Sequence, residues 1–195
     1  MPEIETKHPP PYVAVAGPGE AGVRETELAR EVGSLLGRRG AVVLCGGLGG
    51  VMEACAEGAG AAGGTVVGLL PGFDRSAGNR HLSVAVATGL GELRNGVLVN
   101  ACDALIAVGG SWGTLSEVAL ALRAGKPVAV LAGWGPPAEA ASSSGTALLT
   151  EVSTPAEAVR IAMGDLARRP ARGVAWGGVG WRQGWRRRAG VAGFI

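Results

Sequence analysis

Cysteine and histidine, the residues that most often build metal sites, are scarce in this sequence. The three cysteines, Cys45, Cys55 and Cys102, form no CxxC pair. The two histidines are His8 and His81. Structural metal sites and disulfide frameworks need such residues at close, regular spacing. We therefore expect neither, and we predict that the three thiols are buried as small hydrophobic groups.

Long apolar runs and a secretory leader pattern are also missing. The longest apolar runs, such as residues 104–108 and 128–132, fall far short of the roughly 20 residues needed to cross a bilayer. Residues 1–11 carry charges and three consecutive prolines in place of the apolar stretch of a signal peptide. We expect no membrane span and a cytoplasmic location.

Hydrophobic residues, by contrast, are plentiful. They make up 47% of the 195 residues, against 17% charged residues, which is enough apolar surface to offset the chain entropy lost on folding. A chain of this length fits one domain. We expect a flexible segment over residues 1–11, a single phosphate- or nucleotide-binding domain over 12–167 and a tail over 168–195.

Charge is distributed unevenly between the body and the tail. Residues 1–167 hold 11 basic and all 16 acidic residues, a net charge of −5, whereas residues 168–195 hold seven arginines and no acid. The tail also contains three tryptophans, so one hypothesis is an arm that binds nucleic acid by charge and stacking on an otherwise inert scaffold. The alternatives are a glycine-rich loose end or a segment packed on the body or a partner subunit. Nucleic acid is not the partner we expect.

Short apolar runs alternate with helical patterns along most of the chain. Strands are predicted at residues 12–16, 41–45, 65–70, 82–87, 104–108, 128–131 and 147–152. Helices are predicted at about residues 20–39, 51–62, 90–101, 114–123 and 154–166, with loops at 73–80 and 133–145. In the third helix Leu93, Val97 and Ala101 share one side. Continuously apolar strands separated by helices indicate a mostly parallel sheet covered on both faces, so the predicted fold class is an α/β, Rossmann-like three-layer αβα sandwich.

Three glycine-rich turns follow predicted strands. The first turn holds Gly17 and Gly19, the second holds Gly46, Gly47, Gly49 and Gly50, and the third is Gly109, Gly110, Ser111, Trp112, Gly113 and Thr114. Ligands of parallel sheets bind at the carboxyl ends of the strands, where helix N-termini offer unpaired N–H groups. Glycine lets a phosphate approach the backbone, although it also serves ordinary tight turns. We predict a phosphate-sized anion on these turns.

Two common nucleotide sites do not fit these turns. No GK[ST] follows any of them, which argues against nucleotide hydrolysis of the P-loop kind. The first turn lacks GxGxxG, and Cys45 stands where the ribose-binding acid of a dinucleotide site is expected.

Four segments carry a family resemblance. They are residues 46–52 (GGLGGVM), residues 64–71 (GTVVGLLP), Arg94 and residues 109–117 (GGSWGTLSE). In this order they resemble the LONELY GUY (LOG) superfamily, whose members are often mislabelled as lysine decarboxylases, and the resemblance covers about residues 12–134. It implies a Rossmann-type homodimer or higher homo-oligomer that hydrolyses the N-glycosidic bond of cytokinin or purine nucleoside 5′-monophosphates.

Details of these segments favour one branch of the superfamily. Val108 precedes the glycine pair where the phosphoribohydrolases carry proline, and Asn95 follows Arg94 where they usually carry lysine or glutamine. With residues 72–76 (GFDRS) and 88–95 (TGLGELRN), the sequence resembles the branch containing molybdenum cofactor carrier proteins. The resemblance implies a phosphorylated small molecule as partner, no required cofactor, and the molybdenum cofactor as bound cargo.

The resemblance also implies roles for single residues. Arg94 would hold ribose or phosphate oxygens, and Glu117 would stabilise an oxocarbenium-like sugar or orient the attacking water. From the residues alone, Arg94 is solvated or paired with Glu92, and Glu117 forms a capping box with Thr114.

Other candidate ligand contacts come from the same segments. Met52 and Asn95 belong to the matching runs. Asp74 and Arg75 either contact a ligand or pair with each other, and Trp112 either stacks on a flat heterocycle or packs on a neighbouring loop. A carrier of a phosphorylated heterocycle is the first hypothesis and a phosphoribohydrolase the second.

Overall fold

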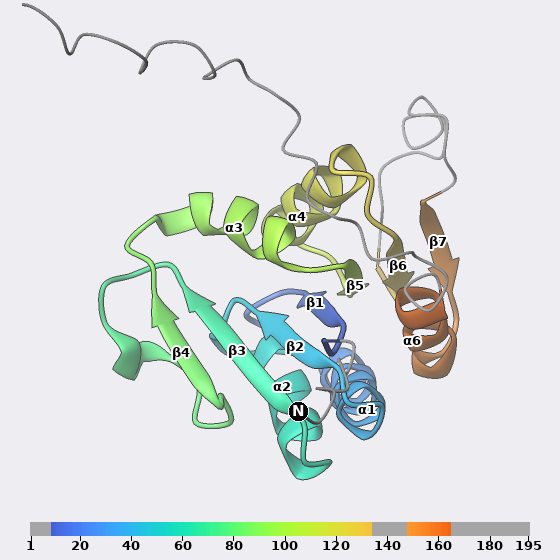
Figure 1. Cartoon of the computed structure of the whole chain (residues 1–195), viewed down its shortest axis with the longest axis horizontal. Helices are drawn as coiled ribbons and strands as arrows, with labels where there is room; N and C mark the ends of the chain where they lie inside the picture. The colour runs from blue at the N-terminus through green and yellow to red at the C-terminus, as the bar shows by residue number, and fades with distance from the viewer. Residues whose placement is uncertain (1–8, 134–147, 165–195) are drawn as a thin grey trace, which may run out of the picture.

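The computed structural model describes residues 9–133 and 148–164, and these form one parallel sheet between helices (Figure 1). The seven strands lie in the order β4-β3-β2-β1-β5-β6-β7, and every neighbouring pair is parallel. Their bounds are β1 Tyr12–Ala16, β2 Val42–Cys45, β3 Thr65–Leu70, β4 Val84–Ala87, β5 Ala104–Val108, β6 Val128–Leu131 and β7 Leu149–Val152. The predicted fold class is confirmed.

Helices cover both faces of the sheet. Their bounds are α1 Val23–Arg38, α2 Val51–Ala61, α3 Arg94–Ala101, α4 Trp112–Arg123 and α6 Pro155–Gly164, with short 3₁₀ turns η1 Arg75–Ala77 and η2 Gly91–Leu93. One buried apolar cluster lies between the sheet and α1, α2 and α6, and a second lies between the sheet and α3 and α4. Figure 1 shows these two layers on opposite sides of the strands.

The predicted elements differ from the structure mainly at their ends. The strands expected at residues 41–45 and 82–87 begin at Val42 and Val84, and the helix expected over 90–101 starts as η2 before α3. Leu93, the last residue of η2, and Val97 of α3 face outward, because the core contacts of α3 come from Leu98 and Val99. Residues 134–147, most of the predicted loop 133–145, and the predicted tail 168–195 lie outside the described residues.

The three cysteines lie in the described part of the chain. Cys45, Cys55 and Cys102 are free and buried, as predicted. Burial raises the pKa of the Cys45 thiol to about 11.

Within the described ranges we find no helix with the length and apolar character that a membrane crossing requires.

The order in which the chain adds strands to the sheet reverses at β1. From β1 the chain adds β2, β3 and β4 on one side, and it then returns to the other side of β1 to form β5. The loops after β1 and β5 therefore leave the sheet in opposite directions, which is the point where open parallel sheets bind ligands. All three predicted glycine turns follow strands at this carboxyl edge.

Helices α1 and α2 pack with their backbones in contact. A Cβ placed on Gly33 would overlap the carbonyl oxygen of Cys55, and one placed on Gly58 would overlap the carbonyl oxygen of Arg30. Glycine at these positions lets the helices approach more closely than side chains would allow. The helix that begins at the second turn is thereby fixed against the core.

This contact makes Gly58→Ala a destabilising substitution. Alanine improves helix propensity by roughly 1 kcal/mol, but overpacking a tight contact costs about 1–3 kcal/mol, so a net loss is expected. Gly60→Ala on the same helix is the matched control, because its Cβ would meet only the His81 carbonyl oxygen at 3.9 Å. Urea denaturation should show Gly58→Ala less stable and Gly60→Ala at least as stable as wild type. Equal stability of the two variants would contradict this packing.

Candidate functional site

The first and second glycine turns touch each other. The backbone N–H of Val51 donates to the carbonyl oxygen of Pro18 at 3.1 Å. Gly50 has φ +62°, and a Cβ there would lie 2.5 Å from the carbonyl oxygen of Gly19. Only glycine combines this backbone conformation with so close an approach. The N-terminus of α2, which has no side-chain cap, therefore opens beside the first turn.

The third turn lies on the other side of the first. A Cβ on Gly17 would lie 2.6 Å from the carbonyl oxygen of Val108, the last residue of β5. Gly109 has φ +67°, and its Cα is covered by the carboxylate of Glu25 from α1. Oε2 of Glu25 accepts a hydrogen bond from the backbone N–H of Gly22 at 2.8 Å. The three predicted turns are thus neighbours on one edge of the sheet.

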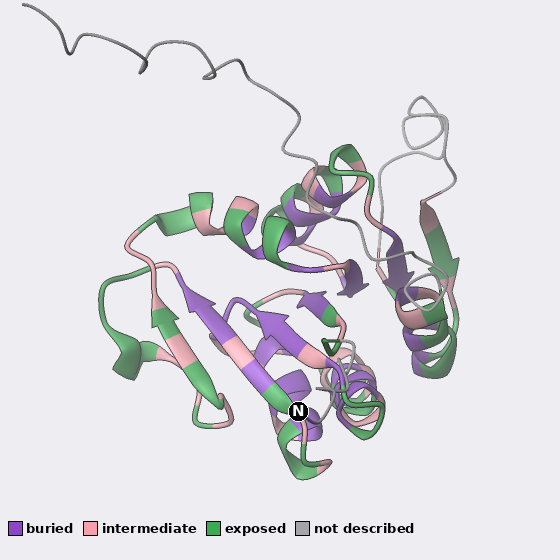
Figure 2. Ribbon diagram, in the orientation of Figure 1, coloured by how far each residue is buried: buried purple, intermediate pink, exposed green. Residues whose placement is uncertain are grey.

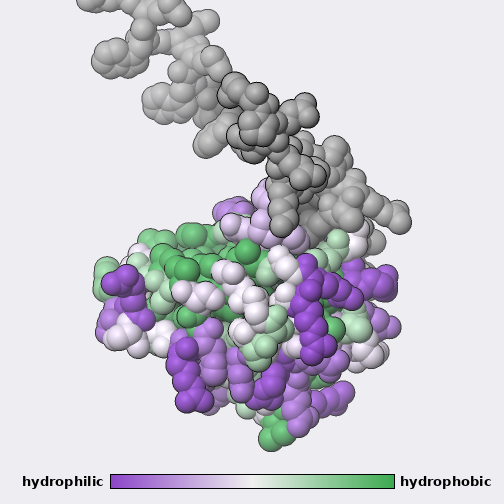
Figure 3. Space-filling model, turned by 60° about the horizontal axis from the view of Figure 1, so that its bottom comes forward, coloured by the Kyte–Doolittle hydropathy of each residue, from purple (hydrophilic) through white to green (hydrophobic). Residues whose placement is uncertain are grey.

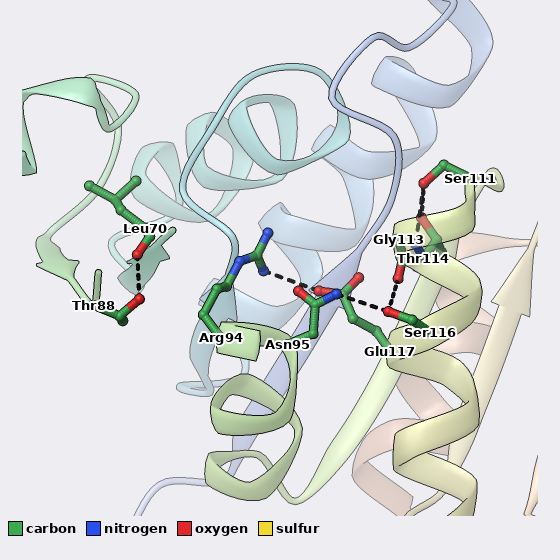
Figure 4. A network of polar contacts seen from close by, with 9 residues as sticks. All are labelled: Leu70, Thr88, Arg94, Asn95, Ser111, Gly113, Thr114, Ser116 and Glu117. Carbon is green, nitrogen blue, oxygen red and sulfur yellow. Dashed lines mark hydrogen bonds and ion pairs between the residues drawn. The ribbon is translucent and has the colours of Figure 1, made fainter. Parts of the chain in front are cut away.

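Arg94 and Glu117 form a buried ion pair beneath the second turn. Nη1 of Arg94 donates to Oε1 of Glu117 at 3.1 Å, and the two side chains are 12% and 7% exposed. Figure 4 shows the pair reaching between the start of α3 and the first turns of α4. A Cβ on Gly46 would lie 2.7 Å from Cζ of Arg94, so Gly46 is the residue that makes room for the guanidinium. This pairing replaces the predicted alternative of Arg94 with Glu92.

One donor in this pair has no partner. Nε of Arg94 is buried and makes no hydrogen bond, and it is the one buried side-chain nitrogen or oxygen without a partner in residues 9–133 and 148–164. A buried unsatisfied donor costs about 1–3 kcal/mol, and more when it carries charge. Such an atom calls for a particular explanation, and an acceptor supplied by a ligand is one of them.

Burial also changes the protonation of Glu117. Removal of the carboxyl from water raises its pKa to about 7, and this effect is larger than the opposing attraction and hydrogen bond of Arg94. A carboxyl with a pKa near neutrality can hold or release a proton at physiological pH. Groups of this kind are candidates for acid–base chemistry as well as for binding.

Neighbouring polar side chains fix the two helices that carry the pair. Nδ2 of Asn95 donates to Oγ of Ser116 at 2.9 Å, and Oγ of Ser116 donates to the carbonyl oxygen of Gly113 at 2.8 Å. Ser111 caps α4, since its Oγ accepts from the backbone N–H of Thr114 at 3.2 Å. The capping box expected between Thr114 and Glu117 is therefore wrong, because Ser111 caps the helix and Glu117 is turned toward Arg94.

The other residues predicted to contact a ligand differ in their burial and in their hydrogen bonds. Met52 is buried in the first turn of α2, whereas Trp112 at the start of α4 is 81% exposed. Asp74 accepts hydrogen bonds from the backbone N–H and hydroxyl of Ser76 at 2.8 and 2.6 Å, and these bonds lower the pKa of its carboxyl. Asp74 and Arg75 are exposed in the loop after β3.

Two residues at this edge were missed by the sequence reasoning. Asn79 donates from Nδ2 to the carbonyl oxygen of Leu48 at 3.0 Å and from its backbone N–H to that of Gly47 at 2.9 Å, so it holds the second turn. Glu25 places a carboxylate on the third turn. The spacing of Glu25 three residues after Gly22 could have indicated a helix cap, but no sequence signal pointed to Asn79.

Metal ligands do not gather here. In the part of the chain that the structure describes, no three His, Cys, Asp or Glu side chains come together as a metal site would require. The groups at this edge are backbone N–H groups at the start of α2, the guanidinium of Arg94 and the carboxyl groups of Glu25 and Glu117. This set suits an organic anion that also carries N–H groups.

The sheet order and the turns at its carboxyl edge define a Rossmann-like α/β protein. The chain belongs to the SLOG cluster4 family, whose model matches residues 10–159. An uncharacterised protein of Archaeoglobus fulgidus is 45% identical over 119 residues, which are 61% of this chain and 78% of that protein.

Two solved structures share both fold and sequence with the chain. The molybdenum cofactor binding protein of the phototrophic bacterium Rippkaea orientalis is 33% identical, with a TM-score of 0.75 over 82% of this chain and 99% of that one. The molybdenum cofactor carrier protein of Chlamydomonas reinhardtii is 32% identical, with a TM-score of 0.72 over 83% of this chain and 100% of that one. The resemblance to the LOG superfamily and its carrier branch is confirmed.

The raised pKa of Glu117 predicts a pH dependence of stability. Between about pH 4.5 and 7 the folded chain keeps a proton that the unfolded chain has released, so this carboxyl favours folding at low pH and the benefit is lost as pH rises to about 7. Against Glu117→Gln, wild type should lose on the order of 1–3 kcal/mol of unfolding free energy across this range.

Urea denaturation at several pH values between 4.5 and 8 measures this difference. Glu57→Gln is the matched control, because it breaks the exposed ion pair of Glu57 with Arg30 and should keep the wild-type profile. Parallel profiles for wild type and Glu117→Gln would show that the folded protein does not hold the Glu117 proton more tightly than the unfolded chain.

Proposed function

We propose that this protein binds a phosphate-bearing heterocycle at the carboxyl edge of its sheet and acts as a carrier, with the molybdenum cofactor as candidate cargo. The observation that carries this proposal is the buried Nε of Arg94, a charged donor without a partner beside the second glycine turn. The two solved relatives named for this cofactor support the choice of cargo.

The charges of the edge suggest how such a ligand lies. The uncapped N-terminus of α2 and the guanidinium of Arg94 both favour a phosphate at the second turn. The carboxylate of Glu25 disfavours an anion at Gly109 and is suited to accept hydrogen bonds from ring N–H groups. The phosphate therefore lies at the second turn and the heterocycle extends toward the third.

Binding and its dependence on Arg94 test this proposal. A ligand that prefers the folded chain raises the midpoint of thermal unfolding, by the equivalent of about 2.7 kcal/mol at 100 times its dissociation constant. The probes are the molybdenum cofactor released from a molybdoenzyme and AMP. Wild type should be stabilised by one of them, and Arg94→Gln should weaken that binding at least tenfold because it removes the charged donor.

Arg30→Gln is the matched control for this experiment. It removes an arginine from an ion pair between α1 and α2 whose side chains are 48% and 43% exposed, and it should bind as wild type does. If neither probe shifts the unfolding midpoint, or if Arg94→Gln and Arg30→Gln bind equally, the proposed site is wrong.

A second candidate function is phosphoribohydrolase activity, which the pKa of Glu117 near 7 favours. In glycoside cleavage one carboxyl group protonates the leaving group or assists the attack of water, and a pKa near the working pH suits that task. In this reading Arg94 holds the sugar phosphate while Glu117 assists departure of the base.

Release of free base from AMP or a cytokinin monophosphate measures this activity. Glu117→Gln should lower the rate at least a hundredfold, since acid–base assistance contributes about 10²–10⁴. Glu57→Gln should retain the wild-type rate. Absence of base would leave binding without hydrolysis, whereas equal rates for the two variants would remove Glu117 from the catalytic step.

A further inference from the structure

Helices α1, α2 and α4 follow the three glycine turns, and they differ in how their first N–H groups are satisfied. At the start of α1, Oε2 of Glu25 accepts a hydrogen bond from the backbone N–H of Gly22. At the start of α4, Oγ of Ser111 accepts from the backbone N–H of Thr114. Helix α2 has no side-chain cap. A phosphate therefore finds unpaired N–H groups at α2, and the other two helix starts leave room for a different kind of contact.

The carboxylate of Glu25 reaches from α1 to the third glycine turn. A Cβ on Gly109 would lie 2.5 Å from Oε1 of Glu25, so this oxygen is in contact with the turn. The other oxygen, Oε2, is held by the Gly22 N–H at 2.8 Å. One oxygen is thus fixed at the start of the helix, and the second is presented at the turn toward which the proposed ligand extends.

No cation pairs with this carboxylate in the part of the chain that the structure describes. The ion pairs found there join Arg30 to Glu57 and Arg94 to Glu117. Glu25 is half-buried on α1, along which Figure 2 shows buried, half-buried and exposed residues. Hydrophilic residues are spread widely over the surface in Figure 3, so what distinguishes Glu25 is where its carboxylate lies. An ionised carboxylate in such a place is a strong acceptor for N–H donors.

The separation of this carboxylate from the second turn suits a ligand the size of a nucleotide. Gly46 follows β2 and Gly109 follows β5, and β1 lies between these two strands. Neighbouring strands are about 4.8 Å apart, so the two turns lie on the order of 10 Å apart. A phosphate at the second turn can therefore carry a heterocycle whose far edge meets Glu25.

A carboxylate is selective for one kind of heterocycle edge. Its two oxygens accept from two parallel N–H groups, and each oxygen can take a second hydrogen bond beside an existing one. Guanine and the pterin ring present such a pair, a ring N–H next to an exocyclic amino group. Adenine presents its amino group next to an unprotonated ring nitrogen, whose lone pair would face a carboxylate oxygen and leave it unpaired.

We propose that Glu25 selects the heterocycle by pairing its carboxylate with a ring N–H and the adjacent amino group, the edge that guanine and pterins share. This inference rests on the proposed function, since it needs the ligand phosphate at the second turn. Ligands with this edge gain two hydrogen bonds to a charged acceptor held over Gly109. The site thereby discriminates between ligands that carry the same phosphate.

Isothermal titration of the full-length chain with GMP, IMP and AMP tests this selection. The three nucleotides share the ribose 5-phosphate, and IMP keeps the ring N–H but lacks the amino group. Wild type should bind GMP roughly tenfold or more tightly than AMP, with IMP between them. Glu25→Gln should lower the preference for GMP over AMP by roughly tenfold or more, because its amide offers one acceptor and one donor, which fit adenine.

The same variant separates selection from helix capping. A Gln side chain can still accept from the Gly22 N–H, so a purely structural role of Glu25 predicts an unchanged preference for GMP in Glu25→Gln. Glu27→Gln is the matched control, because it makes the same chemical change at an exposed position of α1 and should keep the wild-type preference.

Two outcomes overturn the role of Glu25 and leave the phosphate site standing. They are equal affinities of wild type for GMP and AMP, and a preference for GMP that Glu25→Gln leaves intact. Absence of binding to all three nucleotides also overturns the inference. In that case the titration with the molybdenum cofactor decides the proposed function separately.

Discussion

The guanidinium of Arg94 occupies the space in which any residue other than glycine at position 46 would place a side chain. Through its bond to Glu117 it joins the end of β2 to the starts of α3 and α4. The burial that this packing imposes has two chemical results. It brings the pKa of Glu117 to about 7, and it leaves Nε of Arg94 without an acceptor. The proposed binding and the candidate acid–base chemistry at this edge therefore rest on the same packed side chain.

Local sequence signals were sufficient to predict the strands and the glycine turns. Apolar runs and glycine clusters can be recognised within short segments of the sequence, so the parallel sheet and the three turns at its edge could be predicted. The contact between Arg94 and Glu117 depends on the strand order, which brings together residues 23 apart in the chain. The same holds for Asn79, whose partner Leu48 lies 31 residues away. The resemblance named both members of the ion pair, but only the fold shows that they bond to each other.

On the side of α3 and α4, the sheet face over β2, β3 and β4 is only partly covered by helices. The connection between β3 and β4 explains this. This connection packs Leu82 near Gly47 and Gly68, on the side of α2, and its one regular element in the described chain is the short turn η1. No helix of this connection crosses the opposite face, and α3, with eight residues, is too short to cover it. Apolar spacing predicted that Leu93 and Val97 share a side, but periodicity alone cannot tell whether that side meets the core or a partner.

A phosphate that took Nη1 of Arg94 as well as the free Nε would compete with Glu117 and would couple the two candidate chemistries. A phosphate that binds Arg94 offers the guanidinium a stronger acceptor than a carboxyl whose charge burial already disfavours. If Glu117 loses this partner, the attraction that lowers its pKa is lost, and the carboxyl becomes protonated more readily. A protonated Glu117 can donate to a leaving group but cannot activate water as a base. Ligand binding would therefore set Glu117 as an acid, and whether a glycosidic bond lies within its reach decides between a carrier and a hydrolase.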